Sequence, residues 1–588
     1  MSTTAKPVRD QPRGREVSLT TASIAVDFDV PTPMRDGVVL RANVYRPAGE
    51  GRWPVIVSRL PYGKDLPIGT AVLDPVQAAR RGYVVVIQDT RGRFAWDGDW
   101  YPFRHEAEDG ADTIAWAAAL TCSDGRVGTF GASYYGFTQW SAAAEQPPAL
   151  AAMVPFITWA DPLNGLVYRG GALELGAAAN WHLRMGLDVL VRRHRGDPQT
   201  LVRRFHELVA ECDALGNEGY RSLPLNEFAP LRRSGVGQAF FDSLEVPLDG
   251  IRTQPSAILA KRARVKVPTL NVGGWYDIFL GDTIANYQAM RALGVPTRLL
   301  IGPWSHLGRI NPIGERNFGF GSETAFINLE MDFGRLQLRW FDHWLKGIDT
   351  GMLAEPAVRI FVMGANSWRD LPDWPPPATP TAFHLRAGGV LSTESPGDEV
   401  PDGYEYDPDN PVPTRGGSLL LAPEFPGGPF DQRDIQARGD VLTYMSQPLE
   451  RDLAVIGPIH LELWATSSAP DTDFVGRLVD VFPDGRAYNL ADGIVRARYR
   501  GLPSDATASL IEPGRAYRYT VDMWSTSNVF RAGHRIGVQV TSSCFPRWDR
   551  NLNTGGPPLA GASGQVAHQQ ILHDAAHPSH VVLPVVGD

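Results

Sequence analysis

Uninterrupted apolar runs recur in the N-terminal part of the chain and end in polar loops, among them 53-WPVIVSRLPYG and 83-YVVVIQDTRG. A strand that is apolar along its whole length is typical of a parallel sheet covered on both faces. The segment 110-GADTIAWAAAL has helical spacing, and 125-GRVGTFG is expected to form the next strand. Strands and helices therefore alternate, and this alternation predicts an α/β fold with a parallel sheet.

The pattern of apolar residues changes three times along the 588 residues of the sequence. Residues 1–157 and 247–352 show the α/β alternation, whereas residues 158–246 contain segments with helical spacing and no strong strand. Residues 353–588 contain many short alternating runs separated by Gly, Pro and Asp, which predict an all-β sandwich or jelly roll. We therefore expect an α/β domain in two parts, a helical cap inserted into it, and a C-terminal β domain.

Charge and cysteine content exclude several classes of function. The net charge is −9 and no block of Lys and Arg stands out, so we expect no nucleic-acid partner. No apolar run is long enough to cross a bilayer and none has the form of a signal peptide, so no membrane association is expected. The three cysteines, Cys122, Cys212 and Cys544, are scattered and indicate reduced thiols. These features favour a cytoplasmic protein.

The segment 131-GASYYG follows the predicted strand at residues 125–131 and introduces a serine between glycines. A tight turn between a buried strand and a helix exposes such a serine above the sheet edge, and it needs small neighbours because the backbone is strained. The N–H of the next residue, Tyr134, would then face an oxyanion. The second glycine, Gly136, stands one place later than in the usual G-x-S-x-G pattern. On its own, the motif fits a nucleophile, Ser133, or a glycine-rich packing turn.

Two further residues complete a catalytic triad in the order Ser, Asp, His that α/β folds of this kind use. Asp277 follows a predicted strand in 271-NVGGWYDIF, and His306 follows the next strand in 301-IGPWSHLG. Taken separately, the aspartate fits a helix N-cap and the histidine fits an ordinary core residue. Active-site groups of open α/β sheets lie at the carboxyl ends of strands. The joint order and placement therefore favour Ser133, Asp277 and His306 as a triad.

A second oxyanion donor is expected from the loop after an earlier strand, here 59-RLPYGKD. Tyr62 is the obvious donor in this loop, because Pro61 has no N–H and fixes the approach of the chain. The residues alone fit a packed aromatic at Tyr62 equally well.

With these motifs in view, the chain resembles the cocaine esterase branch of the X-Pro dipeptidyl-peptidase-like α/β-hydrolases. The motifs that carry the resemblance extend over nearly the whole chain, and they include RLPYGKD, DGRVGTFGASYYG, GGWYDIF, IGPWSH, DTDFVGRLVDVFPDGRA and HPSHVVLP. The resemblance implies an α/β-hydrolase domain with an inserted helical cap and a C-terminal jelly roll. It also implies Ser133 as the nucleophile, His306 as the base and Asp277 as the orienting acid. The Tyr62 hydroxyl and the Tyr134 N–H would form the oxyanion hole.

The resemblance further implies a pocket for the acyl group that is built from all three domains. The matching positions here are Trp181, Phe279, Leu420 and Leu421. Another cap aromatic of the family's pocket falls in 165-GLVYRGG, where Val167 or Tyr168 is nearest, and Tyr168 is the predicted pocket residue. We expect a serine hydrolase that cleaves small-molecule carboxylic esters, with aromatic or bulky acyl groups, and that needs no metal or organic cofactor. A homodimer is left open.

Two other functions fit parts of the sequence. An X-Pro dipeptidyl aminopeptidase or an α-amino-acid ester hydrolase must bind a substrate ammonium through carboxylates, for which Asp161 and Glu174 in the cap are candidates. A non-catalytic binding protein would depend on the β domain, where 471-DTDF resembles part of a calcium loop and 577-HPSH offers a histidine pair. Neither motif has a complete set of ligands, so the esterase prediction is preferred.

Overall fold

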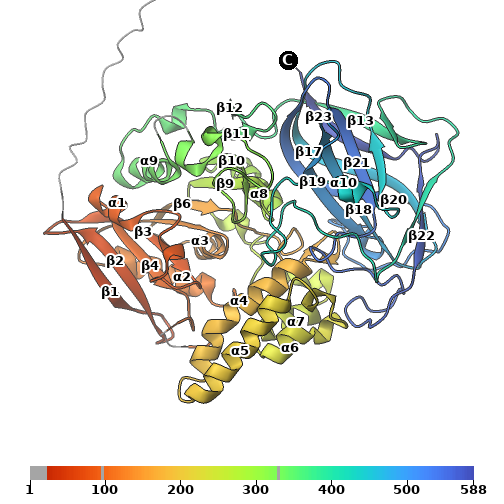
Figure 1. The fold of residues 1–588 in the computed structure, drawn as a ribbon. Helices are drawn as coiled ribbons and strands as arrows, with labels where there is room; N and C mark the ends of the chain where they lie inside the picture. The colour runs from red at the N-terminus through yellow and green to blue at the C-terminus, as the bar shows by residue number, and fades with distance from the viewer. Residues whose placement is uncertain (1–22, 95–97, 328–330, 588) are drawn as a thin grey trace, which may run out of the picture.

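The computed structural model describes residues 23–94, 98–327 and 331–587. Three parts lie side by side: an α/β part that contains the N-terminal strands, a group of helices below it, and a β part that contains the C-terminal strands (Figure 1). The α/β-hydrolase class with an added cap and β domain is therefore confirmed, while the exact domain limits stay a prediction.

Ten strands from the described residues form one mixed sheet in the order β1-β2-β4-β3-β5-β6-β9-β10-β11-β12. The strands from β4 to β11 in this order pair in parallel, and β1, β2 and β12 add antiparallel edges. Their bounds are Ile24–Pro33 (β1), Val39–Pro47 (β2), Trp53–Leu60 (β3), Val84–Asp89 (β4), Ser123–Ala132 (β5), Leu150–Phe156 (β6), Thr269–Tyr276 (β9), Thr297–Ser305 (β10), Val358–Val362 (β11) and Ser367–Leu371 (β12).

Helices cover both faces of this sheet, which explains the uninterrupted apolar runs. In β3, Val55 and Val57 pack in one core cluster with Ile114 of α2, whereas Ile56 points to the other face and shares a cluster with Phe341 of α9. The helix bounds are Pro75–Arg80 (α1), Glu106–Ala118 (α2), Tyr134–Ala144 (α3), Leu280–Ala292 (α8) and Phe333–Lys346 (α9). None of the helices in the described ranges has the length and hydropathy needed to cross a bilayer.

The inserted helices leave the sheet after β6 and return to it at β9, so they stand next to the carboxyl ends of the parallel strands. Leu175–Arg193 (α4) and Pro198–Ala214 (α5) pack together as a long pair, and this pair projects from the rest of the molecule (Figure 1). The shorter elements of this insertion are Tyr168–Arg169 (β7), Ala172–Leu173 (β8), Ala229–Ser234 (α6) and Gln238–Glu245 (α7). We call this group the cap.

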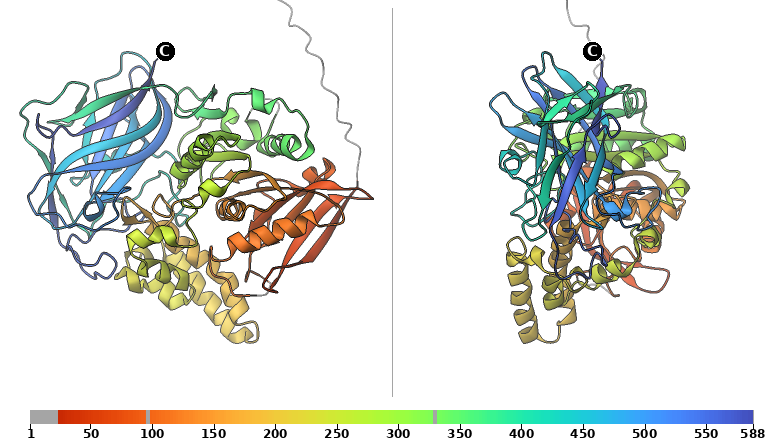
Figure 2. Two further views of the ribbon diagram at one scale, coloured as in Figure 1. Left: turned by 180° about the vertical axis from the view of Figure 1, so that it is seen from behind. Right: turned by 90° about the vertical axis from the view of Figure 1, so that its right-hand side faces the viewer.

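The regular structure of the C-terminal part is almost wholly β, and the view from behind shows its strands as a curved layer beside the α/β part (Figure 2). One strand predicted for this part is placed elsewhere: β11, within 357-AVRIFVMG, pairs in parallel with β10 and extends the α/β sheet. The bounds here are Thr379–Arg386 (β13), Val390–Ser392 (β14), Asp402–Tyr406 (β15), Arg433–Gln436 (α10), Leu442–Met445 (β16), Leu453–Ser467 (β17), Asp473–Val481 (β18), Ala487–Arg496 (β19), Tyr517–Phe530 (β20), Arg535–Thr541 (β21), Ala567–Leu572 (β22) and His580–Val586 (β23).

Candidate active site

Ser133 lies on a strained turn between β5 and α3. Its backbone has φ 56° and ψ −124°, a conformation that a non-glycine residue rarely adopts. Gly131 has φ 147°, and a Cβ there would come within 2.3 Å of the Tyr135 ring. At Gly136, a Cβ would come within 2.6 Å of Thr158. Both glycines are therefore required by close approach, and the displaced second glycine of the motif is explained by packing against Thr158.

Hydrogen bonds join Ser133, His306 and Asp277, the three residues predicted at strand ends. The Ser133 Oγ lies 3.0 Å from His306 Nε2, and His306 Nδ1 lies 2.7 Å from Asp277 Oδ2. The other oxygen of Asp277 accepts the N–H of Phe279 at 2.8 Å, and this side chain is fully buried. Because Asp277 can only accept when ionised, His306 Nδ1 carries the proton and Nε2 can accept the proton of Ser133.

Tyr62 lies in the loop after β3, where its hydroxyl accepts the indole N–H of Trp181 at 3.2 Å. Burial raises the pKa of Tyr62, and hydrogen bonds with Trp181 and Ser133 oppose this rise. The phenol therefore stays protonated near neutral pH and keeps a proton to donate. Arg93 holds the loop in place, because its Nε donates to the carbonyl of Pro61 at 2.8 Å.

Tyr134 is the first residue of α3, so its N–H is one of those that find no carbonyl partner within the helix. Its phenol donates to Glu106 Oε1 at 2.8 Å and accepts the N–H of Phe103 at 2.8 Å. Burial, followed by the charge of Glu106, raises the pKa of Tyr134 well above its usual value. The side chain of Tyr134 is thereby fixed to the single segment that leads into α2.

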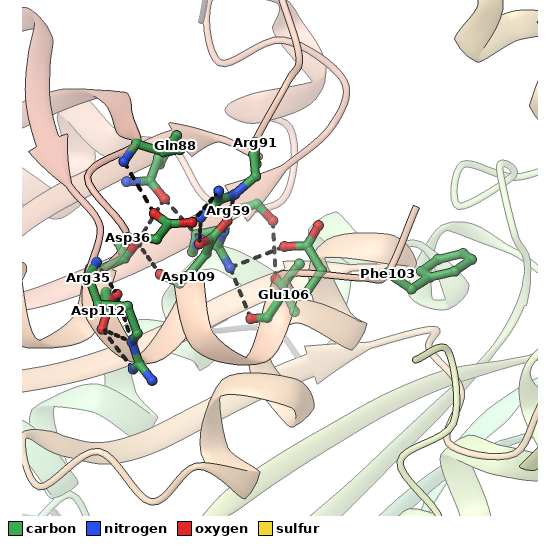
Figure 3. Close-up of polar contacts among 12 residues, drawn as sticks. Arg35, Asp36, Arg59, Gln88, Arg91, Phe103, Glu106, Asp109 and Asp112 are labelled. Carbon is green, nitrogen blue, oxygen red and sulfur yellow. Dashed lines mark hydrogen bonds and ion pairs between the residues drawn. The ribbon is translucent and has the colours of Figure 1, made fainter. Parts of the chain in front are cut away.

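A buried network of ions surrounds the Glu106 carboxylate on one side (Figure 3). Arg59 lies 3.2 Å from Glu106 Oε2, and both side chains are about 5% exposed. Arg59 also donates to Gln88 at 2.8 Å, and its guanidinium lies 3.9 Å from Asp109. Asp109 in turn pairs with Arg91 at 2.6 Å. The start of α3 therefore rests on a connected set of charges rather than on apolar packing alone.

A cavity of about 160 Å³ opens beside Ser133 and is bounded by all three parts of the molecule. Ser133, Tyr62 and Tyr134 line it together with three of the residues predicted for the acyl pocket, Trp181 of the cap, Phe279 of the α/β part and Leu420 of the β part. The lining is mainly aromatic and aliphatic, which is typical of a pocket that excludes water around an apolar group.

Leu421 and Tyr168, also predicted for the pocket, do not line this cavity. Val167, the other residue weighed beside Tyr168, does line it, whereas Tyr168 begins β7 and lines a second cavity. The side chain of Leu421 packs on the opposite side from Leu420, against Gly176 at the start of α4, where an added Cβ would lie 2.6 Å from Leu421.

The cavity also contains residues that the sequence analysis did not single out. Tyr101 and Phe103 come from the loop before α2, Trp159 follows β6, and His182 and Asp242 belong to cap helices α4 and α7. The only sequence signal for His182 is its place beside the predicted Trp181. Loop aromatics and cap residues carry no pattern that predicts which of them meet.

The two carboxylates considered for binding a substrate ammonium are engaged elsewhere. Asp161 forms a bidentate ion pair with Arg252, with a closest approach of 2.7 Å. Glu174 accepts the indole N–H of Trp548 at 2.8 Å, and burial raises its pKa to about 7 while nearby arginines oppose this rise. Neither residue lines the cavity. Both connect the cap to its surroundings.

In the two sequence segments that resemble metal sites, the side chains of the candidate ligands already contact other groups of this chain. Asp471 pairs with Arg498 at 2.7 Å, and Asp473 pairs with Arg496 at 2.8 Å. In 577-HPSH, His577 Nδ1 lies 3.1 Å from Asp574, and a second histidine donates from Nδ1 to a backbone carbonyl. Within the described residues, no group of three or more His, Cys, Asp or Glu side chains is arranged to hold a metal ion.

Comparisons with known proteins give consistent matches over most of the chain. Residues 36–308 match the family described as X-Pro dipeptidyl-peptidase (S15 family), and residues 350–582 match the X-Pro dipeptidyl-peptidase C-terminal non-catalytic domain. The chain is 38% identical to the cocaine esterase of Rhodococcus sp. (strain MB1 Bresler), over 96% of this chain and 99% of that protein.

Solved structures with the same architecture include hydrolases of two kinds. An α-amino acid ester hydrolase is 26% identical with a TM-score of 0.78, over 98% of this chain and 100% of that one. An aminopeptidase from the marine sediment archaeon Thaumarchaeota archaeon is 25% identical with a TM-score of 0.76, over 100% of this chain and 99% of that one. The same arrangement of three parts therefore occurs in relatives named for ester and for peptide substrates.

Proposed function

The chain belongs to the cocaine esterase-like hydrolases of the X-Pro dipeptidyl-peptidase (S15) family, and we propose that it hydrolyses carboxylic esters with aromatic or other bulky acyl groups. It is a serine-type ester hydrolase, as its relatives are. The observation that carries the proposal is the hydrogen-bonded chain from Ser133 through His306 to Asp277 at the wall of an aromatic cavity. The cavity suits an apolar acyl group, and the triad suits attack on its carbonyl carbon.

The reaction would proceed through an acyl-enzyme. His306 Nε2 takes the proton from Ser133 Oγ as that oxygen attacks the ester carbonyl, and Asp277 holds the imidazole in the required tautomer. His306 then gives the proton to the leaving alcohol. A water molecule, deprotonated by His306, attacks the acyl-enzyme, and Ser133 regains its proton as the carboxylic acid leaves.

The oxyanion of each tetrahedral intermediate would accept two hydrogen bonds. One comes from the Tyr62 hydroxyl and the other from the Tyr134 N–H at the start of α3. This assignment is supported by the position of both residues on the cavity wall beside Ser133 and by the raised pKa of Tyr62, which keeps its proton available. Donors of this kind typically contribute about 3 kcal/mol each to transition-state stabilisation.

The proposal is tested with 4-nitrophenyl esters of benzoic, phenylacetic and butyric acids, and with a fluorophosphonate probe that labels active serine hydrolases. We expect hydrolysis of the aromatic acyl esters and labelling of the purified protein, and loss of both in Ser133→Ala. Equal labelling of wild type and Ser133→Ala would show that another residue reacts and would overturn the proposal.

An X-Pro dipeptidyl aminopeptidase or α-amino-acid ester hydrolase remains a second candidate, because one carboxylate, Asp242, does line the cavity. Both activities need an anionic partner for the substrate ammonium. Comparing a 4-nitrophenyl phenylacetate with an Ala-Pro 4-nitroanilide distinguishes the candidates. Faster cleavage of the anilide, measured as kcat/KM, would replace the esterase with the peptidase.

A further inference from the structure

His182 lines the cavity, and one of its two ring nitrogens is unpaired among the described residues. Its Nδ1 lies 2.8 Å from the carbonyl of Ala178, one turn earlier in α4. Since a carbonyl only accepts, Nδ1 carries the proton and Nε2 carries the lone pair. Nε2 has no hydrogen-bond partner among the residues that the structure describes. The ring lies edge-on to Trp181 and Phe240, at 4.9 Å and 5.8 Å between centroids, so the acceptor is set in aromatic surroundings.

The protonation state of His182 keeps this nitrogen an acceptor. Burial lowers the pKa of His182 to about 4, so the ring is neutral at physiological pH. A neutral imidazole with its proton on Nδ1 offers a single strong acceptor at Nε2.

Asp242 is a second acceptor on the same cavity and is the only acidic residue among the described residues that line it. Its two oxygens accept from the Tyr101 hydroxyl at 2.8 Å and from Gln238 Nε2 at 2.6 Å. A carboxylate offers about four acceptor positions, so capacity remains for a ligand. The hydrogen-bond partners of Asp242 in the described residues, Tyr101 and Gln238, are both neutral, and the nearby Arg104 guanidinium lies 3.6 Å over the Tyr101 ring.

The lining contains no Lys or Arg within the described ranges, and besides the two acceptors it combines apolar groups with the neutral side chains of Ser243, Gln254 and Ser256. A hydroxyl or ammonium buried in such a cavity is strongly disfavoured unless an acceptor meets it. We propose that the cap side of the cavity selects esters whose acyl group carries a hydrogen-bond donor, with His182 Nε2 and the Asp242 carboxylate as its acceptors. The inference rests on the proposed esterase function and adds the substrate class to it.

The test uses 4-nitrophenyl esters of phenylacetic, 3-phenylpropanoic and 4-phenylbutanoic acids. Each acid is prepared with a para methyl, a para hydroxyl or a para aminomethyl group. The length of the acid sets how deep the para group reaches into the cavity, and the methyl ester of each length serves as the reference without a donor. The measured quantity is the ratio of kcat/KM between the donor ester and the methyl ester of the same length. We expect this ratio to be about 5 to 10 for at least one length of acid, because a hydrogen bond of ordinary strength gives an effect of this size.

Two variants separate the acceptors. His182→Phe keeps a ring of similar shape without the acceptor, and we expect the hydroxyl-to-methyl ratio to fall to one or below. Asp242→Asn keeps an acceptor for Tyr101 but removes the charge, and we expect the ammonium ester alone to lose its advantage. His194→Phe, the same substitution at the C-cap of the same helix and outside the cavity lining, should keep the wild-type ratios.

The outcomes are distinct. A preference for the hydroxyl assigns His182 as the main acceptor, and a preference for the ammonium assigns Asp242, and either result supports the inference. Donor esters no better than methyl esters at every length, or ratios unchanged in both His182→Phe and Asp242→Asn, would overturn it. If no ester of the series is hydrolysed, the proposed function fails first, and Ser133 labelling by the fluorophosphonate reports that failure separately.

Discussion

The two sides of the cavity are held in different ways. On the α/β side, Tyr134 hydrogen-bonds to Glu106, which pairs with Arg59 in a buried set of charges (Figure 3). We call these three residues the floor. On the cap side, Trp181 and His182 meet their neighbours mainly through ring edges and faces. Hydrogen bonds between ions depend strongly on direction, so they fix the positions of individual atoms. Ring contacts are less directional and mainly require side chains of matching shape.

We therefore expect the two sides of the pocket to have different roles. The floor carries the proposed oxyanion N–H, and an error in the position of such a donor is costly in rate. The cap carries groups that meet the substrate, where exchange of one ring for another changes selectivity without disturbing the triad. If the polar floor governs catalysis and the cap governs selection, substitutions on the two sides should change different properties of the enzyme.

The largest effect is expected when the triad itself is disturbed. Asp277→Asn keeps the size of a side chain that is fully buried but no longer stabilises the His306 tautomer with its proton on Nδ1. We expect kcat for a 4-nitrophenyl ester to fall about 10⁴-fold, with little change in KM, as for a triad that loses its orienting acid. A fall of less than tenfold would show that Asp277 is not the orienting acid.

The position of this triad could be predicted from the sequence because strand ends leave a strong local signal. Ser133, Asp277 and His306 each follow an apolar run, and all parallel strands of a sheet deliver their ends to one edge. Each of the three motifs is weak evidence alone, but their order Ser, Asp, His along the chain is the order that a catalytic triad of this fold requires. The α/β alternation itself follows from β3, whose neighbouring valine and isoleucine side chains face opposite helix layers.

The rest of the site depends on contacts that no periodicity encodes. Glu106 reaches Tyr134 because α2 begins earlier than the helical spacing at residue 110 indicated. His182 and Asp242 share the cavity because α4 and α7 pack at a particular angle over the sheet, and that angle is set by side-chain shapes across the cap. The strand β11 pairs in parallel with β10, and the alternation of its own residues does not specify which sheet it joins.

Tyr62 contacts both sides of the pocket, and its substitution is expected to cause the second largest loss of activity. Its hydroxyl accepts from Trp181 and hydrogen-bonds with Ser133, and its own proton is the one proposed to meet the oxyanion. Tyr62→Phe should lower kcat about 10²- to 10³-fold with a small change in KM, the usual result of removing one oxyanion donor. Trp181→Phe removes the indole N–H to Tyr62 and part of the ring that lines the cavity, and it should change kcat less than Tyr62→Phe does. The reverse ranking would place control of catalysis on the cap side.

The floor is tested by a matched pair of substitutions on α2. Glu106→Gln weakens a buried ion pair and the acceptor of the Tyr134 hydroxyl, so unfolding should become easier by about 2–3 kcal/mol and kcat should fall. Asp112→Asn weakens the pair with Arg35, whose side chain is 55% exposed, and should cost less than about 1 kcal/mol. Urea denaturation and ester kinetics measure both effects.

The interpretation depends on how the two readouts change together. Affinity for a boronic acid that mimics the tetrahedral intermediate should fall with kcat in Glu106→Gln while KM stays near its wild-type value. A loss of stability with unchanged kcat and unchanged boronate affinity would limit Glu106 to a structural role and would remove the functional contrast between floor and cap.

The smallest effect concerns the cap and depends on pH. Burial lowers the pKa of His182 to about 4, from 6.5 for an exposed histidine. Between these values the unfolded chain binds a proton at this site that the folded chain excludes, so the stability contributed by the neutral ring is present above pH 6.5 and lost as pH falls toward 4. His182→Phe removes this dependence. The wild type should therefore lose about 2 kcal/mol more than His182→Phe between pH 7.5 and pH 5, measured from urea denaturation at each pH. Equal losses would mean that the folded cap accepts the proton on Nε2, so that the cap side of the cavity is open to water and its contrast with the floor disappears.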